Sequence, residues 1–245
     1  MTNSKQIDIV GTVFKDGLLD ILGDKLYGIY IFGAAAFPGT FPLGDIDVHV
    51  ILISPLAQDE KTGLEKFHEE LDKKYATYEE LFDGYYLLLE DARKKAPPCS
   101  QMWQLAVDDA WALHRAHILA GRQVTLYGPT PETIYQPADW SELETALYHE
   151  LDYIEKHLHK YPGYCYLNLC RLIYSFKHRD VVLSKEQAYE WGKKNLTEWK
   201  VHIELAGKSY SNQATTGENN FLLGEIEKFL SFAKDCIQRS GKSER

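Results

Sequence analysis

The stretch LYGIYIFGAAAFPGTFPLGDIDVHVILI, residues 26–53, contains the features that decide the fold of this 245-residue chain. Its first part, residues 26–32, is rich in aromatic and β-branched residues, which predicts a buried strand. Its last part, residues 46–53, begins with apolar and polar residues in alternation, which predicts a second strand. Glycines and prolines between the two parts exclude regular structure and predict a turn-rich loop. The segment is therefore a strand–loop–strand unit, in which Asp45 directly precedes the second strand and Asp47 lies at its start.

The two aspartates are separated by one residue, so on a strand Asp45 and Asp47 point to the same face. Two carboxylates that share a face repel each other unless a cation compensates their charge. Hard oxygen ligands in this arrangement suit Mg²⁺, which usually shares its coordination shell with substrate phosphates. The small residues Gly33 and Ala34 offer backbone N–H groups to which an anion can come close. Together these features predict a metal-assisted nucleotidyl-transfer site, although a DxD pair alone is a weak signal.

Composition narrows the class of protein. Hydrophobic residues make up 44% of the chain and are interleaved with charge, which is typical of a globular protein. A net charge of −9 without a Lys/Arg block argues against a nucleic-acid partner. The N-terminus lacks a signal-peptide pattern and no apolar run approaches the roughly 18 residues of a membrane span, so a cytoplasmic location is expected. Metal-ligand spacing is missing from the four cysteines, which are Cys99, Cys165, Cys170 and Cys236.

The rest of the chain divides into two halves with different patterns. Before residue 137, the expected elements are a helix over 60–80, a strand over 85–89, a helix from Ser100 to Gly121 and a strand over 124–129. After it, helices alone are expected, beginning at a Ser141–Glu144 capping box, at residue 164, at a Ser184–Gln187 capping box and at residue 219. The sequence thus predicts an α/β (α+β) domain with a mixed sheet over 1–137, followed by an all-α helical bundle domain over 138–245.

Residues 33–47 resemble the "GS…(S)DxD" signature of the nucleotidyltransferase superfamily. The spacing is similar to that of the aminoglycoside (3'')(9) adenylyltransferases, which confer resistance to streptomycin and spectinomycin. Further segments resemble this family in the same order along the chain: QVTLYGP (123–129), LNLCRLIYS (167–175) and LSKEQAYEW (183–191). The resemblance covers roughly residues 10–237 and implies a nucleotidyltransferase domain followed by the family's helical domain.

The resemblance also implies roles for three carboxylates. Asp45 and Asp47 match the family's Mg²⁺ ligands. Asp83, in FDGYYLLLED at the start of the next predicted strand, matches the carboxylate that acts as catalytic base toward the acceptor hydroxyl. This residue is one methylene shorter than the family's glutamate, and a turn residue beside Gly84 is the alternative interpretation.

Other residues match the family's nucleotide-binding positions. Arg171 matches an arginine that contacts the nucleotide phosphates, for which a guanidinium is well suited. Lys185, which follows Ser184 at a predicted helix N-terminus, matches a second phosphate contact, with a solvated surface lysine as the alternative. Tyr210, in AGKSYSNQ, lies where the family has a tyrosine near the nucleotide. The loop residues that would receive the triphosphate are Gly33 and Ala34.

Besides Asp83, the sequence departs from the family in three places. Ala34 and Gly44 stand where the family has serines, so two hydroxyl groups that could hold phosphate are missing. The stretch KHLHKYPGYC, residues 156–165, has no carboxylate, whereas streptomycin-modifying members of the family bind the cationic drug with acidic residues at this place. Three carboxylates lie upstream and are interpreted as a solvated helix face or as a substitute wall for a cation: Glu150, Asp152 and Glu155. Streptomycin is therefore not the expected acceptor.

The sequence predicts a Mg²⁺-dependent, monomeric adenylyltransferase that transfers AMP from ATP to a hydroxyl of a small aminoglycoside- or aminocyclitol-like acceptor. Two alternatives remain. One is a nucleotide-binding regulatory protein without transfer activity, which Ala34 and Gly44 favour. The other is a nucleotidyltransferase with a macromolecular acceptor. Retention of Asp45, Asp47 and Asp83 favours the enzyme over the regulatory protein. The acceptor itself and the preferred nucleotide base do not follow from the sequence.

Overall fold

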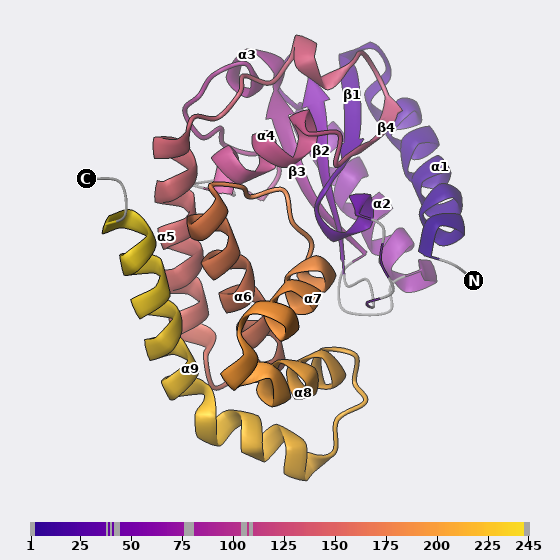
Figure 1. Ribbon diagram of the computed structural model, residues 1–245. Coiled ribbons are helices and arrows are strands. Elements are labelled where there is room, and N and C mark those ends of the chain that lie inside the picture. The colour runs from indigo at the N-terminus through magenta and orange to yellow at the C-terminus, as the bar shows by residue number, and fades with distance from the viewer. Residues whose placement is uncertain are drawn as a thin grey trace. The chain divides into compact units, whose positions relative to one another are not determined.

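The computed structural model describes residues 3–37, 39, 41, 45–75, 81–103, 107 and 110–242. Its contacts divide the chain into two compact units. The sheet unit comprises Met1–Pro38 and Leu43–Ala138, and the helical unit comprises Gly39–Pro42 and Asp139–Arg245. Figure 1 shows the sheet in the first unit and only helices as regular elements in the described part of the second. The predicted fold class is confirmed, while the domain limits drawn at residue 137 stay a prediction.

The sheet unit contains the strands β1 (Leu26–Ile31), β2 (Ile46–Leu52), β3 (Phe82–Leu88) and β4 (Val124–Tyr127). Its helices are α1 (Asn3–Leu22), η1 (Gly23–Lys25), η2 (Gly33–Ala36), α2 (Gln58–Tyr75), α3 (Leu89–Ala92), α4 (Trp111–Leu119) and η4 (Pro131–Thr133), where η marks a 3₁₀ helix. The helical unit contains α5 (Trp140–His157), α6 (Pro162–His178), α7 (Lys185–Asn195), η5 (Thr197–Trp199), α8 (Lys200–Tyr210) and α9 (Thr216–Lys242). Across the described residues, none of these helices combines the length and apolar character that crossing a membrane requires.

The sheet is mixed, and its central strands β1 and β2 are buried on both faces. Its strand order is β3-β2-β1-β4, with β1 antiparallel to β2 and β4, and β2 parallel to β3. On one face, Val48 and Val50 join a core that includes Phe14 of α1 and Leu64 of α2. On the other, Ile51 joins a core that includes Trp111 of α4 and Tyr135. Burial on both faces explains why β1 is almost entirely apolar and why β2 is apolar after His49.

The helix predicted from Ser100 is wrong in its first part. Helix α4 begins only at Trp111. The Ser100 hydroxyl instead accepts hydrogen bonds from the N–H groups of Tyr86, at 3.1 Å, and Met102, at 3.3 Å. The N–H of Gln101 donates to the carbonyl of Tyr86 at 2.7 Å. The segment therefore satisfies backbone groups of the edge strand β3, a use of a serine side chain that competes with helix capping.

Helix capping in the second half is partly as predicted. The box at Ser184 is confirmed: its hydroxyl accepts from the N–H of Gln187, whose side chain accepts from the N–H of Ser184. The box predicted at Ser141–Glu144 is wrong, because Asp139 caps α5 and exchanges the same pair of bonds with Glu142. Aspartate is as good a cap as serine, so neighbouring candidates of equal propensity cannot be separated by sequence.

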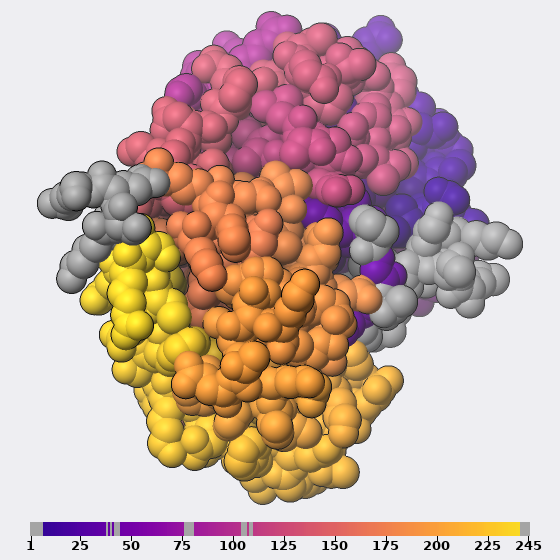
Figure 2. Space-filling view, in the orientation of Figure 1, coloured from indigo at the N-terminus to yellow at the C-terminus, as the bar shows by residue number. Residues whose placement is uncertain are grey.

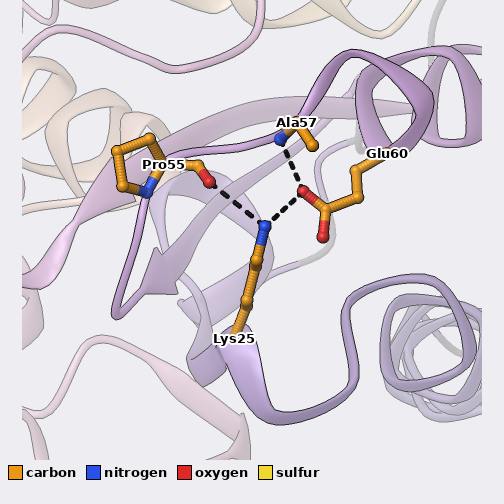
Figure 3. A network of polar contacts seen from close by, with 4 residues as sticks. All are labelled: Lys25, Pro55, Ala57 and Glu60. Atoms are coloured by element: carbon orange, nitrogen blue, oxygen red, sulfur yellow. Dashed lines mark hydrogen bonds and ion pairs between the residues drawn. The ribbon is translucent and has the colours of Figure 1, made fainter.

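A polar network joins η1 to the start of α2 (Figure 3). The Lys25 Nζ lies 2.7 Å from the Glu60 Oε2 and also donates to the carbonyl of Pro55 at 3.3 Å. The N–H of Ala57 donates to the same carboxylate oxygen at 2.6 Å. The hydrogen bond from Lys25 and that from Ala57 lower the pKa of the Glu60 carboxyl. The network thus ties the connection between β2 and α2 to the residue that precedes β1.

We expect Glu60→Gln to lower the free energy of unfolding by about 1 kcal/mol at pH 7, because neutral hydrogen bonds replace charge-assisted ones. The folded-state pKa is depressed, so this contribution is present above the unfolded value near 4.5 and is lost as the pH falls through the folded value. Urea denaturation at pH 7 and at the lowest pH where both proteins fold measures the difference. A gap between the two proteins that stays constant with pH would contradict the assignment.

Candidate functional site

Two aspartates from neighbouring strands lie side by side at one end of the sheet. Strands β2 and β3 are parallel, and Asp47 pairs in register with Asp83. Paired residues of adjacent strands project to the same face, so both carboxylates leave the sheet on one side. Strand β3 begins at Phe82, three residues before the predicted start, so Asp83 lies within the strand and not in a turn before it.

Asp45 lies just before the strand that carries Asp47, at the boundary predicted for this strand. Strand β2 begins at Ile46, so Asp47 is its second residue and is half-buried, whereas Asp45 is exposed. Over the residues that the structure describes, no three His, Cys, Asp or Glu side chains are arranged to hold a metal ion. A cation here would therefore depend on one or two carboxylates and on oxygen atoms of a ligand, which is the usual coordination of Mg²⁺.

Gly33 leaves the space that the Asp47 carboxylate occupies. The backbone of Gly33 has φ +63°, and a Cβ at this position would lie 1.8 Å from the Asp47 Oδ2. The N–H of Phe32 donates to the carbonyl of Asp47 at 2.9 Å, which fixes the end of β1 beside β2. Ala34 follows in η2 and is exposed. The structure thus brings the predicted phosphate loop and Asp47 together, while the predicted departure at Gly44 lies outside the described residues.

Buried, hydrogen-bonded rings lie next to Asp47, on the same face of the sheet. His49 is fully buried two residues after Asp47, with its Nδ1 3.1 Å from the Tyr135 hydroxyl and its Nε2 3.1 Å from the His114 Nδ1. Burial, followed by His114, lowers the pKa of His49; burial, followed by His117, lowers the pKa of His114 to about 3. Both imidazoles are therefore neutral at pH 7 and add no positive charge to the strand that carries Asp47.

In the helical unit, Arg171 is held by a neighbour on its own helix. Its Nη1 donates to the Oδ1 of Asn168 at 3.0 Å, and the Asn168 Nδ2 donates to the carbonyl of Tyr164 at 3.0 Å. Asn168 is 3% exposed, so its amide has little freedom to turn. Burial raises the pKa of the Tyr164 phenol, Glu150 raises it further, and Arg171 lowers it.

Lys185 and Tyr210 lie together. The Lys185 Nζ is 5.6 Å from the ring centroid of Tyr210 and 5.2 Å from that of Tyr164. Lys185 opens α7 and Tyr210 ends α8, two helices that form much of the surface shown in orange in Figure 2. The Phe41 ring lies 5.5 Å from Tyr210, which explains why Gly39–Pro42 group with the helical unit.

The predicted site residues thus form two sets, one in each unit. The sheet unit carries Gly33, Ala34, Asp45, Asp47 and Asp83, and the helical unit carries Arg171, Lys185 and Tyr210. Sequence reasoning missed Tyr164 and Asn168, which contact the predicted cations. Their one signal is spacing, because they precede Arg171 by seven and three residues and share its helix face.

Glu150 and Glu155 of α5, which precede the helix that carries Arg171, differ in their surroundings. Glu155 pairs with Lys234 of α9 at 2.7 Å, so its charge is already compensated. Burial raises the pKa of the Tyr164 phenol, and the negative charge of Glu150 raises it further. Of these two carboxylates, Glu150 is therefore the better candidate for contact with a cationic molecule.

Comparison with known proteins agrees with the fold and with the predicted resemblance. Residues 133–235 match the family model of the aminoglycoside adenylyltransferase C-terminal domain. The fold matches the crystal structure of the spectinomycin adenyltransferase AAD(9) from Enterococcus faecialis with ATP and spectinomycin. The two share 18% sequence identity with a TM-score of 0.72, over 93% of this chain and 99% of the other. No curated protein matches this chain. The predicted resemblance is confirmed by the family model over residues 133–235 and by the shared fold.

Proposed function

We propose that this chain, which carries an aminoglycoside adenylyltransferase C-terminal domain over residues 133–235, transfers AMP from ATP to a hydroxyl of a small aminocyclitol-like acceptor. The observation that carries the proposal is the in-register pairing of Asp47 with Asp83 beside Gly33. A regulatory protein that only binds a nucleotide has no need for a second carboxylate on the neighbouring strand. The structure is therefore better suited to transfer than to binding alone.

Magnesium fits the donor atoms at this place. Asp45 and Asp47 offer hard carboxylate oxygens, and the missing side chain of Gly33 gives the Asp47 carboxylate room to lie beside the loop. One or two carboxylates are enough for Mg²⁺ when substrate phosphates complete its shell. When bound, the ion supplies neutralisation of the triphosphate and of the pyrophosphate that leaves.

The side chains then have separate tasks. Asp83 accepts the proton of the acceptor hydroxyl, so that the oxygen can form a bond to the α-phosphorus while the bond to pyrophosphate breaks. Arg171 and Lys185 bind phosphate oxygens, for which a guanidinium fork and an ammonium at a helix N-terminus are suited. Tyr210, beside Lys185, contacts the nucleotide.

The acceptor is proposed to be an aminocyclitol of the spectinomycin kind. The protein with the similar fold was crystallised with spectinomycin, and the stretch 156–165 lacks the carboxylates expected for streptomycin. Glu150 is the carboxylate that a cationic amine of the acceptor would meet near Tyr164. Because an amine is smaller than the guanidino groups of streptomycin, a single carboxylate is a sufficient partner.

Pyrophosphate release tests the proposal directly. The purified protein is incubated with Mg²⁺ and each nucleoside triphosphate, with spectinomycin, with streptomycin or without an acceptor. We expect release with ATP that depends on spectinomycin, and a product heavier by one adenylyl group in mass spectrometry. ATP binding without turnover on any acceptor in an aminocyclitol panel would favour the regulatory protein instead.

A further inference from the structure

Two side chains of α6, Tyr164 and Asn168, contact the cationic groups of Lys185 and Arg171. We propose that Tyr164 and Asn168 are positioning residues that orient Lys185 and Arg171 for the triphosphate before the nucleotide binds. The proposal rests on the proposed function, in which these two cations contact phosphate. Neither Tyr164 nor Asn168 has a counterpart among the roles implied by the family resemblance.

The first contact is between Lys185 and two aromatic rings. Its Nζ lies 5.2 Å from the Tyr164 centroid and 5.6 Å from the Tyr210 centroid, both within the range of a cation–π interaction. A lysine side chain has many rotamers, and fixing one of them on binding lowers affinity. Two rings that already hold the ammonium reduce that entropic loss.

The second contact orders Arg171. The guanidinium donates to the Asn168 Oδ1, and the amide of Asn168 is in turn fixed by its bond to the carbonyl of Tyr164. Because Asn168 is almost fully buried, this amide cannot rotate away without leaving a polar group unsatisfied. The remaining N–H groups of the guanidinium keep a defined direction, which is the condition for bidentate binding of phosphate.

The two contacts form one unit on the helix. Tyr164, Asn168 and Arg171 follow each other at spacings of four and three residues, so they lie on one face of α6. Burial raises the pKa of the Tyr164 phenol, and the charge of Arg171 offsets part of this rise. Tyr164 therefore contributes its ring to one cation and its backbone carbonyl to the anchor of the other.

A double-mutant cycle on Tyr164 and Lys185 tests the proposal. Calorimetric titration with Mg·ATP is made on wild type, Tyr164→Leu, Lys185→Met and the double variant. We expect Tyr164→Leu to weaken ATP binding about three- to tenfold, the range of one cation–π contact. In the Lys185→Met background the same change should have no further effect, which a general loss of structure would not produce.

Two variants separate the ring from the rest of the side chain. Tyr164→Phe keeps the ring and should bind ATP as wild type does. Replacement of Tyr164 by a trifluorinated phenylalanine keeps the shape but weakens the ring's attraction for cations, so it should reproduce the loss even if Tyr164→Leu folds poorly. The matched control is Tyr75→Leu, which removes a ring from a similar pair with Lys74 at 4.9 Å and should leave ATP affinity unchanged.

The same cycle with Asn168→Ala and Arg171→Met tests the second contact, with the same expected non-additivity.

Equal ATP affinity of wild type, Tyr164→Leu and the fluorinated variant would overturn the positioning role and leave the proposed function intact. A loss that is the same with and without Lys185 would overturn it as well. Wild type that binds no ATP would overturn both proposals, so the two failures are distinguishable.

Discussion

Asp47→Asn is expected to lower the rate of AMP transfer on the order of a thousandfold, because several kcal/mol of transition-state stabilisation depend on the metal that this carboxylate would hold. The thermal midpoint should stay unchanged or rise slightly. Asp47 and Asp83 are register partners on adjacent strands, and like charges in that position destabilise a sheet. Pyrophosphate release and thermal unfolding of the same preparations measure both effects.

An aspartate elsewhere in the sheet unit provides the control. Asp20 of α1 is exposed, so Asp20→Asn makes the same chemical change away from the sheet end and should leave transfer unaffected. The Mg²⁺ concentration needed for half-maximal activity should also increase in Asp47→Asn, if any activity is measurable. Full activity of Asp47→Asn at the wild-type Mg²⁺ concentration would exclude this carboxylate as a ligand.

The sheet could be predicted because its physical signals are local. Strand β1 is an apolar run rich in aromatic and β-branched residues, β2 begins with an alternating pattern, and the glycines and prolines between them stop regular structure. Helix α1 was not predicted. Its apolar positions, such as Phe14 and Leu18, are buried against the sheet unit, and this tertiary partner was not visible in the sequence. The start of β3 was misplaced because Asp83 and Gly84 are typical of turns.

The site could be predicted only in part, for a related reason. The DxD pair and the loop before it lie close in sequence, so their proximity follows from strand periodicity. The pairing of Asp47 with Asp83 depends on the register of β2 and β3, which sequence does not specify. The bond between His49 and His114, 65 residues apart, could not be foreseen either. Contacts between side chains of distant elements require the tertiary fold.

Asp83→Asn is the second large expected effect, and it separates the base from the metal ligands. A positioned general base contributes about a hundredfold to ten-thousandfold to a rate, so we expect a loss in that range. Affinity for Mg·ATP should remain at the wild-type value, in contrast to Asp47→Asn. Transfer by Asp83→Asn should increase with pH, because deprotonation of the acceptor hydroxyl then no longer needs the carboxylate. Steady-state kinetics between pH 6 and pH 9 and calorimetry measure these outcomes.

Asp83→Glu is the matched variant for this experiment. It keeps the charge, adds one methylene and restores the glutamate that the family resemblance implies, so transfer should stay within about tenfold of wild type. The aspartate lies within β3 at the register position of Asp47, so a longer side chain extends from the same face of the sheet. If Asp83→Asn instead loses Mg·ATP binding to the same degree as Asp47→Asn, then Asp83 holds the metal. The proton of the acceptor must in that case leave by another group.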